Sequence, residues 1–209
     1  PGEGLDRWAR PRPWRWRSCA ARLAALHAQL HVVHAEPDFD IDRPRQAQLY
    51  RHLIESASPL TDEQRAICLE VLERPSRRER LCHGNLAPGS VLIDNRDLSV
   101  TDWSLASTGD PVLDVATTRV AVHAFSAQVD APRVFGQLLR SAGNLYVDTY
   151  LKIAERPPSR AELESMVPVA AAARLGVLQL ADGPSAEQDS LLLLIQSHLR
   201  RAARSPPHA

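Results

Sequence analysis

Residues 81–116 read LCHGNLAPGSVLIDNRDLSVTDWSLASTGDPVLDVA, and this stretch decides the fold class of the chain. Two short runs of strand-forming residues, 91–93 and 98–101, flank the polar turn 94–97, which predicts a β-hairpin. Because a hairpin brings its two ends together, we expect three polar side chains to converge at its open end. They are Asn85 before the hairpin, Ser90 at its entry and Asp102 at its exit.

Outward from this stretch, apolar residues recur with a helical period on both sides. Two capping-box spacings, Thr61 with Gln64 and Ser159 with Glu162, mark helix starts. We expect helices at about residues 18–37, 45–57, 61–74, 112–129, 134–154 and 159–178, and a last helix from about residue 185 onward. The predicted fold class is therefore α+β, predominantly α, with one central β-hairpin.

The side chains that we expect to converge suit phosphoryl transfer. Proteins usually bind Mg²⁺ through one or two carboxylates together with phosphate oxygens and water. A loop residue that orients a hydroxyl, beside a metal-binding Asp and a small oxygen ligand, is typical of phosphoryl-transfer sites. Taken singly, Asp102 and Asp110 could equally be turn and helix-capping residues, because Asp is common at both positions.

Several short motifs of the chain occur in the same order in one known family. They are Leu23–His31, His83-Gly84-Asn85, Ser90, Asp102-Trp103, Gly109-Asp110-Pro111 and Asp114-Val115-Ala116. In order and spacing they resemble the aminoglycoside phosphotransferase and choline kinase family, which carries H-G-D-x-x-x-x-N, a short hairpin, D-[WF] and G-D-P-x-x-D-[LV]-A. The resemblance implies a protein-kinase-like fold, of which this chain would contain the C-terminal lobe only, with the N-terminal lobe missing.

The resemblance also implies roles for the three converging residues. Asp102 would bind the Mg²⁺ that bridges the phosphates of ATP (or GTP), and Ser90 would be a second metal ligand. Asn85 would occupy the catalytic position, next to the hydroxyl of a small-molecule substrate. Three further residues would support the loop and the helix after it, namely His83, Asp110 and Asp114.

Two of these positions depart from the family pattern. Asn85 stands where the family has Asp, and an amide cannot accept a proton at neutral pH, whereas general-base assistance is worth ~10²–10⁴ in rate. Ser90 stands where the family has Asn, and its hydroxyl has a shorter reach. We therefore expect a weakened or degenerate phosphotransferase, with a non-catalytic pseudokinase or binding module as the alternative.

Kinase-like folds take a glycine-rich phosphate loop and a strand lysine from an N-terminal lobe. No such glycine loop precedes His83, and the single lysine, Lys152, lies in a late helix. We therefore divide the chain into an irregular post-hinge linker segment (residues 1–17), the kinase-like C-terminal lobe (18–204) and a tail (205–209). We expect an N-terminal lobe in a longer parent chain.

The composition argues against some classes of binding partner and favours one cellular compartment. Twenty-five basic residues balance 25 acidic ones, which argues against nucleic acid as a partner. The longest wholly apolar run, Leu191 to Ile195, is far too short to cross a membrane, so no membrane association is expected. Three cysteines without a C-x-x-C pair and an N-terminus without an apolar core favour the cytoplasm.

Two clusters leave other interpretations open. His27, His31 and His34 recur on one helical face and could bind zinc, although the neighbouring leucines favour histidines at the margin of a packed face. In the N-terminal segment, five arginines alternate with three tryptophans, a composition that could bind single-stranded nucleic acid. Trp14 and Trp16 are more simply interpreted as anchors that dock this segment on the lobe.

Overall fold

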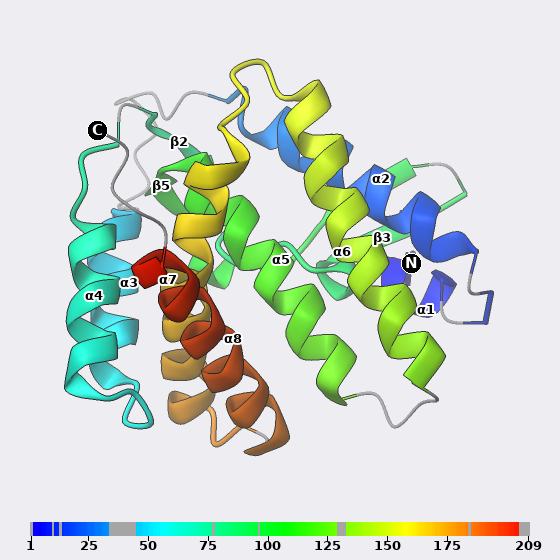
Figure 1. The fold of residues 1–209 in the computed structure, drawn as a ribbon. Helices are drawn as coiled ribbons and strands as arrows, with labels where there is room; N and C mark the ends of the chain where they lie inside the picture. Colours follow the sequence, from blue (N-terminus) through cyan, green and yellow to red (C-terminus); the bar gives the residue numbers. More distant parts are fainter. Residues whose placement is uncertain are drawn as a thin grey trace.

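The computed structural model describes residues 2–9, 11–12, 14–33, 45–76, 78–95, 97–128, 133–183 and 185–204. Within these ranges the chain forms eight α-helices and two small antiparallel sheets (Figure 1). The helices are α1 (Leu5–Ala9), α2 (Arg15–Leu30), α3 (Gln46–Ser56), α4 (Asp62–Leu72), α5 (Pro111–Gln128), α6 (Arg133–Ile153), α7 (Arg160–Leu180) and α8 (Ser185–Arg204). The predicted class, α+β and predominantly α, is confirmed.

Residues 81–116 contribute strands to both sheets. One has the strand order β1 (Glu3–Gly4), β3 (Val91–Asp94), β4 (Asp97–Val100), and the other pairs β2 (Arg80–Cys82) with β5 (Ser107–Gly109). The predicted hairpin is β3–β4, in which Val91 faces Val100. Asn95 in its turn has a φ of 54°, a left-handed conformation that Asn tolerates. The β2–β5 pairing joins the chain before the hairpin to the chain after it.

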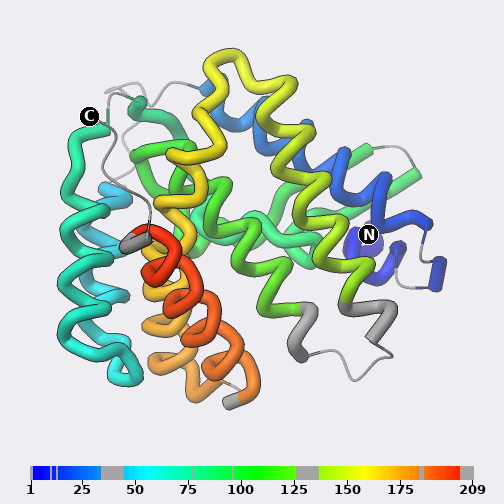
Figure 2. Tube along the Cα trace, in the orientation of Figure 1, coloured from blue at the N-terminus to red at the C-terminus, as the bar shows by residue number. Residues whose placement is uncertain are grey.

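The helices pack in an order that makes α5 the shared element of the fold. On one side α5 contacts α6, which packs along α2, and on the other side it contacts α7 and α8. The helix α7 also packs against α3 and α4. Figure 1 and the tube in Figure 2 show α5 running through the middle of the molecule between these two groups. Helix α5 therefore lies where both halves of the core meet.

Local sequence signals place the helix ends well. Thr61 Oγ1 accepts the N–H of Gln64 at 3.2 Å, and Gln64 Oε1 accepts the N–H of Thr61 at 3.0 Å. Ser159 and Glu162 make the equivalent pair at 3.1 and 2.6 Å, so both predicted capping boxes are confirmed. The helices expected over 45–57, 112–129 and 134–154 are found within one residue at each end. The first long helix ends earlier than expected, at Leu30, and Pro37 lies outside the described residues.

The expectation that residues 1–17 are irregular is wrong for the part that the structure describes. Strand β1 pairs with β3, and Leu5 and Ala9 in α1 are fully buried. The long helix α2 begins at Arg15, about three residues earlier than expected, so the limit that we drew after residue 17 lies inside this helix. The pairing of β1 with β3 and the burial of Leu5 and Ala9 join this segment to the core.

The tryptophans of this segment have three different environments. Trp16 is 2% exposed, and its ring centroid lies 6.2 Å from that of Phe125. The guanidinium groups of Arg15 and Arg22 lie 4.4 and 5.7 Å from the ring centroid of Trp8. The expected anchoring role is confirmed for Trp16 and is wrong for Trp14, which is 69% exposed.

Among the described residues, one helix is long and apolar enough to cross a membrane by length and composition. It is α7, in which an 18-residue window has a mean hydropathy of 1.3. However, 61% of that window is buried inside the protein. Its apolar surface is accounted for by the four helices that pack against it.

We expect two helical glycines to respond in opposite ways to alanine. A Cβ at Gly176 in α7 would lie 1.9 Å from the carbonyl oxygen of Leu53 in α3, whereas a Cβ at Gly143 in α6 would meet Val122 at an ordinary 3.5 Å. Gly176→Ala should therefore lower the free energy of unfolding by ~1–3 kcal/mol. Gly143→Ala should raise it by ~0.5–1 kcal/mol, because glycine disfavours a helix interior. Urea unfolding of the two variants and the wild type measures both changes, and a stabilising Gly176→Ala would contradict the packing of α3 on α7.

Candidate active site

The loop that carries Asn85 is held by one buried carboxylate. Asp114 lies in the first turn of α5 and is fully buried. Its Oδ2 accepts the backbone N–H of His83 at 2.7 Å, and its Oδ1 accepts the backbone N–H of Gly84 at 2.8 Å. This carboxylate therefore positions the two residues that directly precede Asn85.

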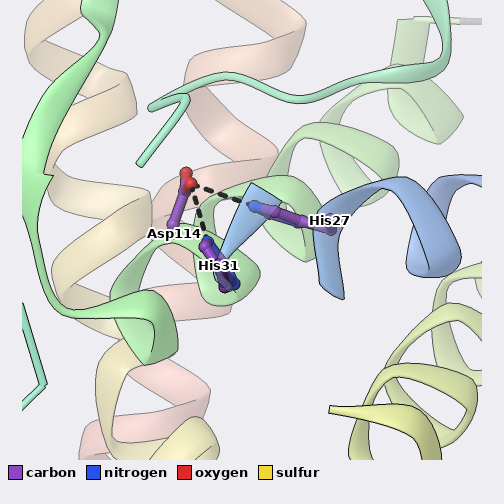
Figure 3. A group of neighbouring side chains, drawn as sticks. All are labelled: His27, His31 and Asp114. Atoms are coloured by element: carbon purple, nitrogen blue, oxygen red, sulfur yellow. Dashed lines mark hydrogen bonds and ion pairs between the residues drawn. The ribbon is translucent and has the colours of Figure 1, made fainter. Parts of the chain in front are cut away.

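Two histidines, His27 in α2 and His31 directly after it, complete the hydrogen bonds of this carboxylate (Figure 3). His27 Nε2 lies 2.9 Å and His31 Nε2 lies 3.3 Å from Asp114 Oδ2. On the other side of each ring, Nδ1 lies 2.6 Å from the hydroxyl of Tyr146 and 2.7 Å from that of Tyr150, respectively. Because a carboxylate only accepts hydrogen bonds, each ring donates its Nε2–H to Asp114, and both nitrogens of each ring have an oxygen partner.

Burial and hydrogen bonding decide the charge state of this network. Burial alone would raise the pKa of Asp114, but the adjacent His27 and the hydrogen bonds from both histidines hold it well below its ordinary value. Burial, and then the proximity of His27, lower the pKa of His31 to about 4. Asp114 is thus a carboxylate at neutral pH, and His31 beside it is neutral.

The expectation that these histidines lie at the margin of a packed face is wrong. His27 and His31 are 0% and 8% exposed, because Asp114 and two tyrosines satisfy their ring nitrogens in the core. One ligand atom from each of His27, His31 and Asp114 lies within 4.8 Å of the others, a spacing that could hold a metal ion. A cation would have to displace the N–H groups that already bond to Asp114, so we interpret the cluster as a hydrogen-bond network. His34 lies outside the described residues.

The loop requires glycine at position 84. Gly84 has a φ of +79°, in the left-handed region that glycine adopts without steric cost. A Cβ there would lie 2.3 Å from the carbonyl oxygen of Leu105. Gly84 therefore packs directly against Leu105, in the segment that follows Asp102.

Hydrogen bonds also join this loop to the exit of the hairpin. His83 Nε2 donates to the carbonyl oxygen of Thr101 at 2.9 Å, and His83 Nδ1 accepts the backbone N–H of Asn85 at 3.3 Å. The backbone N–H and the hydroxyl of Thr101 both donate to the carbonyl oxygen of Ser90, at 2.9 and 3.2 Å. Because Asp102 directly follows Thr101, the structure brings the predicted site residues together at the open end of the hairpin.

The three predicted site residues differ in how available their side chains are. Ser90 is buried; its Oγ accepts the N–H of Ala87 at 2.9 Å and lies 3.0 Å from the carbonyl oxygens of Asn85 and Ala87. Asp102 is exposed, has a φ of 61°, and accepts the hydroxyl of Ser104 at 2.8 Å. Solvent therefore reaches the Asp102 carboxylate, whereas the Ser90 hydroxyl bonds within its own loop.

A cavity of about 200 Å³ opens beside Asn85. Trp16 of α2 and Phe125 of α5 are its aromatic lining residues, and residues 87–89 of the loop also line it. Its charged residues are Asp6 and Arg174. The guanidinium of Arg174 donates from Nε to the buried carboxylate of Glu187 at 2.8 Å. The volume suits a small organic molecule with an apolar part.

Asp110 has the supporting role that was expected of it. Its Oδ1 accepts the N–H of Val112 at 2.8 Å, which caps the start of α5. Its own N–H donates to Oε1 of the buried Gln46 at 2.8 Å. Asp110 therefore fixes the helix from which Asp114 reaches the loop.

Sequence reasoning missed the tyrosines of the buried network. Tyr146 and Tyr150 are four residues apart on α6, and the two helices α2 and α6 pack along each other. His27 and His31 have the same spacing at the C-terminal end of α2, where His31 directly follows the last helical residue. The equal spacing of the two imidazoles and the two hydroxyl groups was visible in the sequence. It predicts contacts between them only when α2 is known to pack against α6, and the sequence does not show that pairing.

We expect the protein to lose stability in mild acid through His31. Because the pKa of His31 is lowered to about 4 on folding, the unfolded chain binds this proton near pH 6.5 and the folded protein does not. The stability that comes from this residue is complete above pH 6.5. It falls by up to ~1.4 kcal/mol per pH unit between pH 6.5 and 4.

Unfolding midpoints of the wild type and of His31→Asn between pH 7.5 and 4.5 measure this dependence. The exposed His52 of α3 provides a matched control, and His52→Asn should keep the wild-type profile. His31→Asn should show a flatter profile. Parallel profiles for His31→Asn and the wild type would contradict the assignment.

Comparisons with known proteins agree with the family resemblance of the sequence. A sequence profile of the phosphotransferase enzyme family matches residues 1–155. A search of curated proteins found no match to this sequence.

Two solved structures have a similar fold. A choline/ethanolamine kinase family protein from Mesorhizobium loti matches with a TM-score of 0.55 and 16% identity, over 93% of this chain and 65% of that chain. The choline kinase LicA from Streptococcus pneumoniae matches with a TM-score of 0.56 and 14% identity, over 90% of this chain and 65% of that chain. The chain thus spans just under two thirds of the length of each. The family match over most of its sequence places the chain in the phosphotransferase enzyme family.

Proposed function

We propose that this chain is the kinase-like C-terminal lobe of a small-molecule phosphotransferase, with weakened catalytic power. The observation that carries the proposal is the position of Asn85. The carboxylate of Asp114 holds the preceding residues, and the Asn85 residue lines a cavity of about 200 Å³. Asp102 lies on the adjacent segment with its carboxylate open to solvent.

The phosphate donor in this proposal is ATP (or GTP), bound between this lobe and an N-terminal lobe of a longer parent chain. The length supports this, because the chain covers 65% of each of the two similar kinases. Kinase-like folds take the phosphate-binding loop and its lysine from the N-terminal lobe. The present chain would then supply the acceptor cavity and the residues around Asp102.

Asp102 suits a magnesium ion, and Ser90 suits it poorly. One exposed carboxylate is a sufficient protein ligand when phosphate oxygens and water complete the shell. The Ser90 hydroxyl is buried and already bonds to Ala87 and to the carbonyl group of Asn85. We therefore keep Asp102 as the proposed metal ligand and give Ser90 a structural role. When bound, the ion would neutralise charge on the phosphates.

Asn85 would position the acceptor without taking up its proton. An acceptor hydroxyl in the cavity would attack the terminal phosphorus of the nucleotide; the new O–P bond would form as the bond to the bridging oxygen breaks, and the proton would leave to solvent. Positioning accounts for much of catalysis in phosphoryl transfer, so an amide retains part of the effect. Loss of the general base would remove a factor of ~10²–10⁴.

The same residues also favour a second candidate, a binding module without catalytic activity. Asn85 is an amide at the catalytic position, and the Ser90 hydroxyl is engaged inside its loop. In this case the cavity beside Asn85 would hold a ligand that is not turned over. The two candidates share the fold and differ only in phosphoryl transfer.

The acceptor in this proposal is a small molecule with a hydroxyl group, and the compartment is the cytoplasm. The cavity volume of about 200 Å³ supports a small acceptor. All three cysteines are free and buried, as suits a reducing compartment. The balance of 25 basic and 25 acidic residues gives no general attraction to nucleic acid or to an anionic membrane.

We expect Asn85→Asp to increase phosphoryl transfer by ~10²–10⁴, because it restores a carboxylate that can accept the proton of the acceptor. ADP release from Mg·ATP measures the rate, with choline and ethanolamine as acceptors and with the chain extended upstream in its reading frame. Asn95→Asp in the hairpin turn adds the same charge outside the cavity and should leave the rate unchanged. Equal rates for Asn85→Asp and the wild type would favour the binding module.

We expect Asp102→Asn to abolish stabilisation by Mg·ATP. A ligand present at 100 times its Kd stabilises a protein by ~2.7 kcal/mol, which raises the unfolding midpoint. The midpoint of the upstream-extended wild type should therefore rise with Mg·ATP and rise less with ATP and a chelator. The exposed Asp97 of β4 is the matched control, and Asp97→Asn should keep the shift. A full shift in Asp102→Asn would exclude Asp102 as a metal ligand.

A further inference from the structure

A second cavity, of about 140 Å³, lies among α5, α6, α7 and α8. It has Val122 in common with the cavity beside Asn85, and its other lining residues are different. Arg119 and His123 are one turn apart on α5, and Arg140 and Asn144 are one turn apart on α6. The two pairs of polar side chains therefore come from neighbouring helices.

The polar lining of this cavity is rich in hydrogen-bond donors. Arginine donates only, whereas asparagine and neutral histidine each offer both a donor and an acceptor. The Nε2 atom of His123 already lies 3.1 Å from the Ser190 hydroxyl. Among the described residues, none that lines the cavity carries a carboxylate. The guanidinium of Arg119 is balanced by Glu164, whose Oε1 lies 2.7 Å from Nη1, outside the lining. The guanidinium of Arg140 is exposed and forms no ion pair with any described residue. The cavity thus has an unbalanced positive charge at its mouth.

The rest of the lining is apolar. Val120, Val122 and Val167 are buried, and Leu194 adds a fourth aliphatic side chain. Gly143 presents no side chain, which leaves space between α6 and Val122. Burial, and then Arg140 and Arg119, lower the pKa of His123, so this ring adds no charge at neutral pH. An occupant needs a short aliphatic part for the valines and an anionic group for Arg140.

We propose that this cavity binds a small aliphatic carboxylate, at a site separate from the one that contains Asn85. A carboxylate pairs with a guanidinium through two parallel hydrogen bonds, which an ammonium or a neutral group cannot do. The volume suits a branched chain of a few carbon atoms. Because neither Asn85 nor residues 87–89 of its loop line this cavity, the ligand is an effector and does not occupy the catalytic position.

Isovalerate is the probe for the test, and the chain itself is titrated at neutral pH in two-dimensional ¹⁵N NMR. We expect saturable shifts at the amides of Gly143 and Asn144. Arg140→Gln should weaken binding roughly tenfold or more, because a charge-assisted hydrogen bond is lost. The exposed Arg200 of α8 does not line the cavity, and Arg200→Gln should bind isovalerate as the wild type does.

The neutral analogue isovaleramide tests the charge requirement and should bind at least tenfold more weakly. Equal binding of the amide and the acid would overturn the proposal, and so would equal affinities of Arg140→Gln and Arg200→Gln. Absence of saturable shifts would overturn it as well. Gly143→Leu fills the space beside Val122 and should also abolish binding. None of these measurements depends on phosphoryl transfer, so they remain informative if Asn85 proves inactive.

Discussion

The carboxylate of Asp114 is fully buried and accepts four N–H groups from two segments far from it in the sequence. A buried charge costs several kcal/mol in lost hydration, and it is tolerated only where hydrogen bonds replace the water. Here two backbone amides and two imidazoles do so. Any arrangement of the helices that removes one donor leaves part of that cost uncompensated, so the network selects one arrangement of its elements.

The elements selected in this way are those that form the site. The imidazoles come from His27 in α2 and from His31 directly after it, the hydroxyls that orient them come from α6, and the carboxylate comes from α5. The backbone donors are His83 and Gly84, directly before Asn85. The cavity beside Asn85 has walls from α2, α5 and the loop, so its shape depends on the same contacts as the buried charge.

Features set by neighbouring residues could be predicted from the sequence. The two capping boxes and the β3–β4 hairpin depend on residues at most ten positions apart, and all were expected. The pairing of β2 with β5 joins Cys82 to Ser107, and strands of three residues carry no periodicity. The link from His27 to Tyr146 spans 119 residues. Such contacts depend on how helices pack, and no local pattern contains that information.

The two departures from the family pattern, Asn85 and Ser90, differ in whether the side chain holds the loop in shape. The described hydrogen bonds of Asn85 involve its backbone, because its N–H bonds to His83 and its carbonyl oxygen lies 3.0 Å from the Ser90 hydroxyl. An Asp or an Asn there leaves those bonds unchanged, so the amide alters the chemistry of the position and not the shape of the loop. The Ser90 side chain bonds the loop to itself, and a larger side chain would have to give up these contacts. Position 85 can therefore change without refolding the loop, whereas position 90 is tied to it.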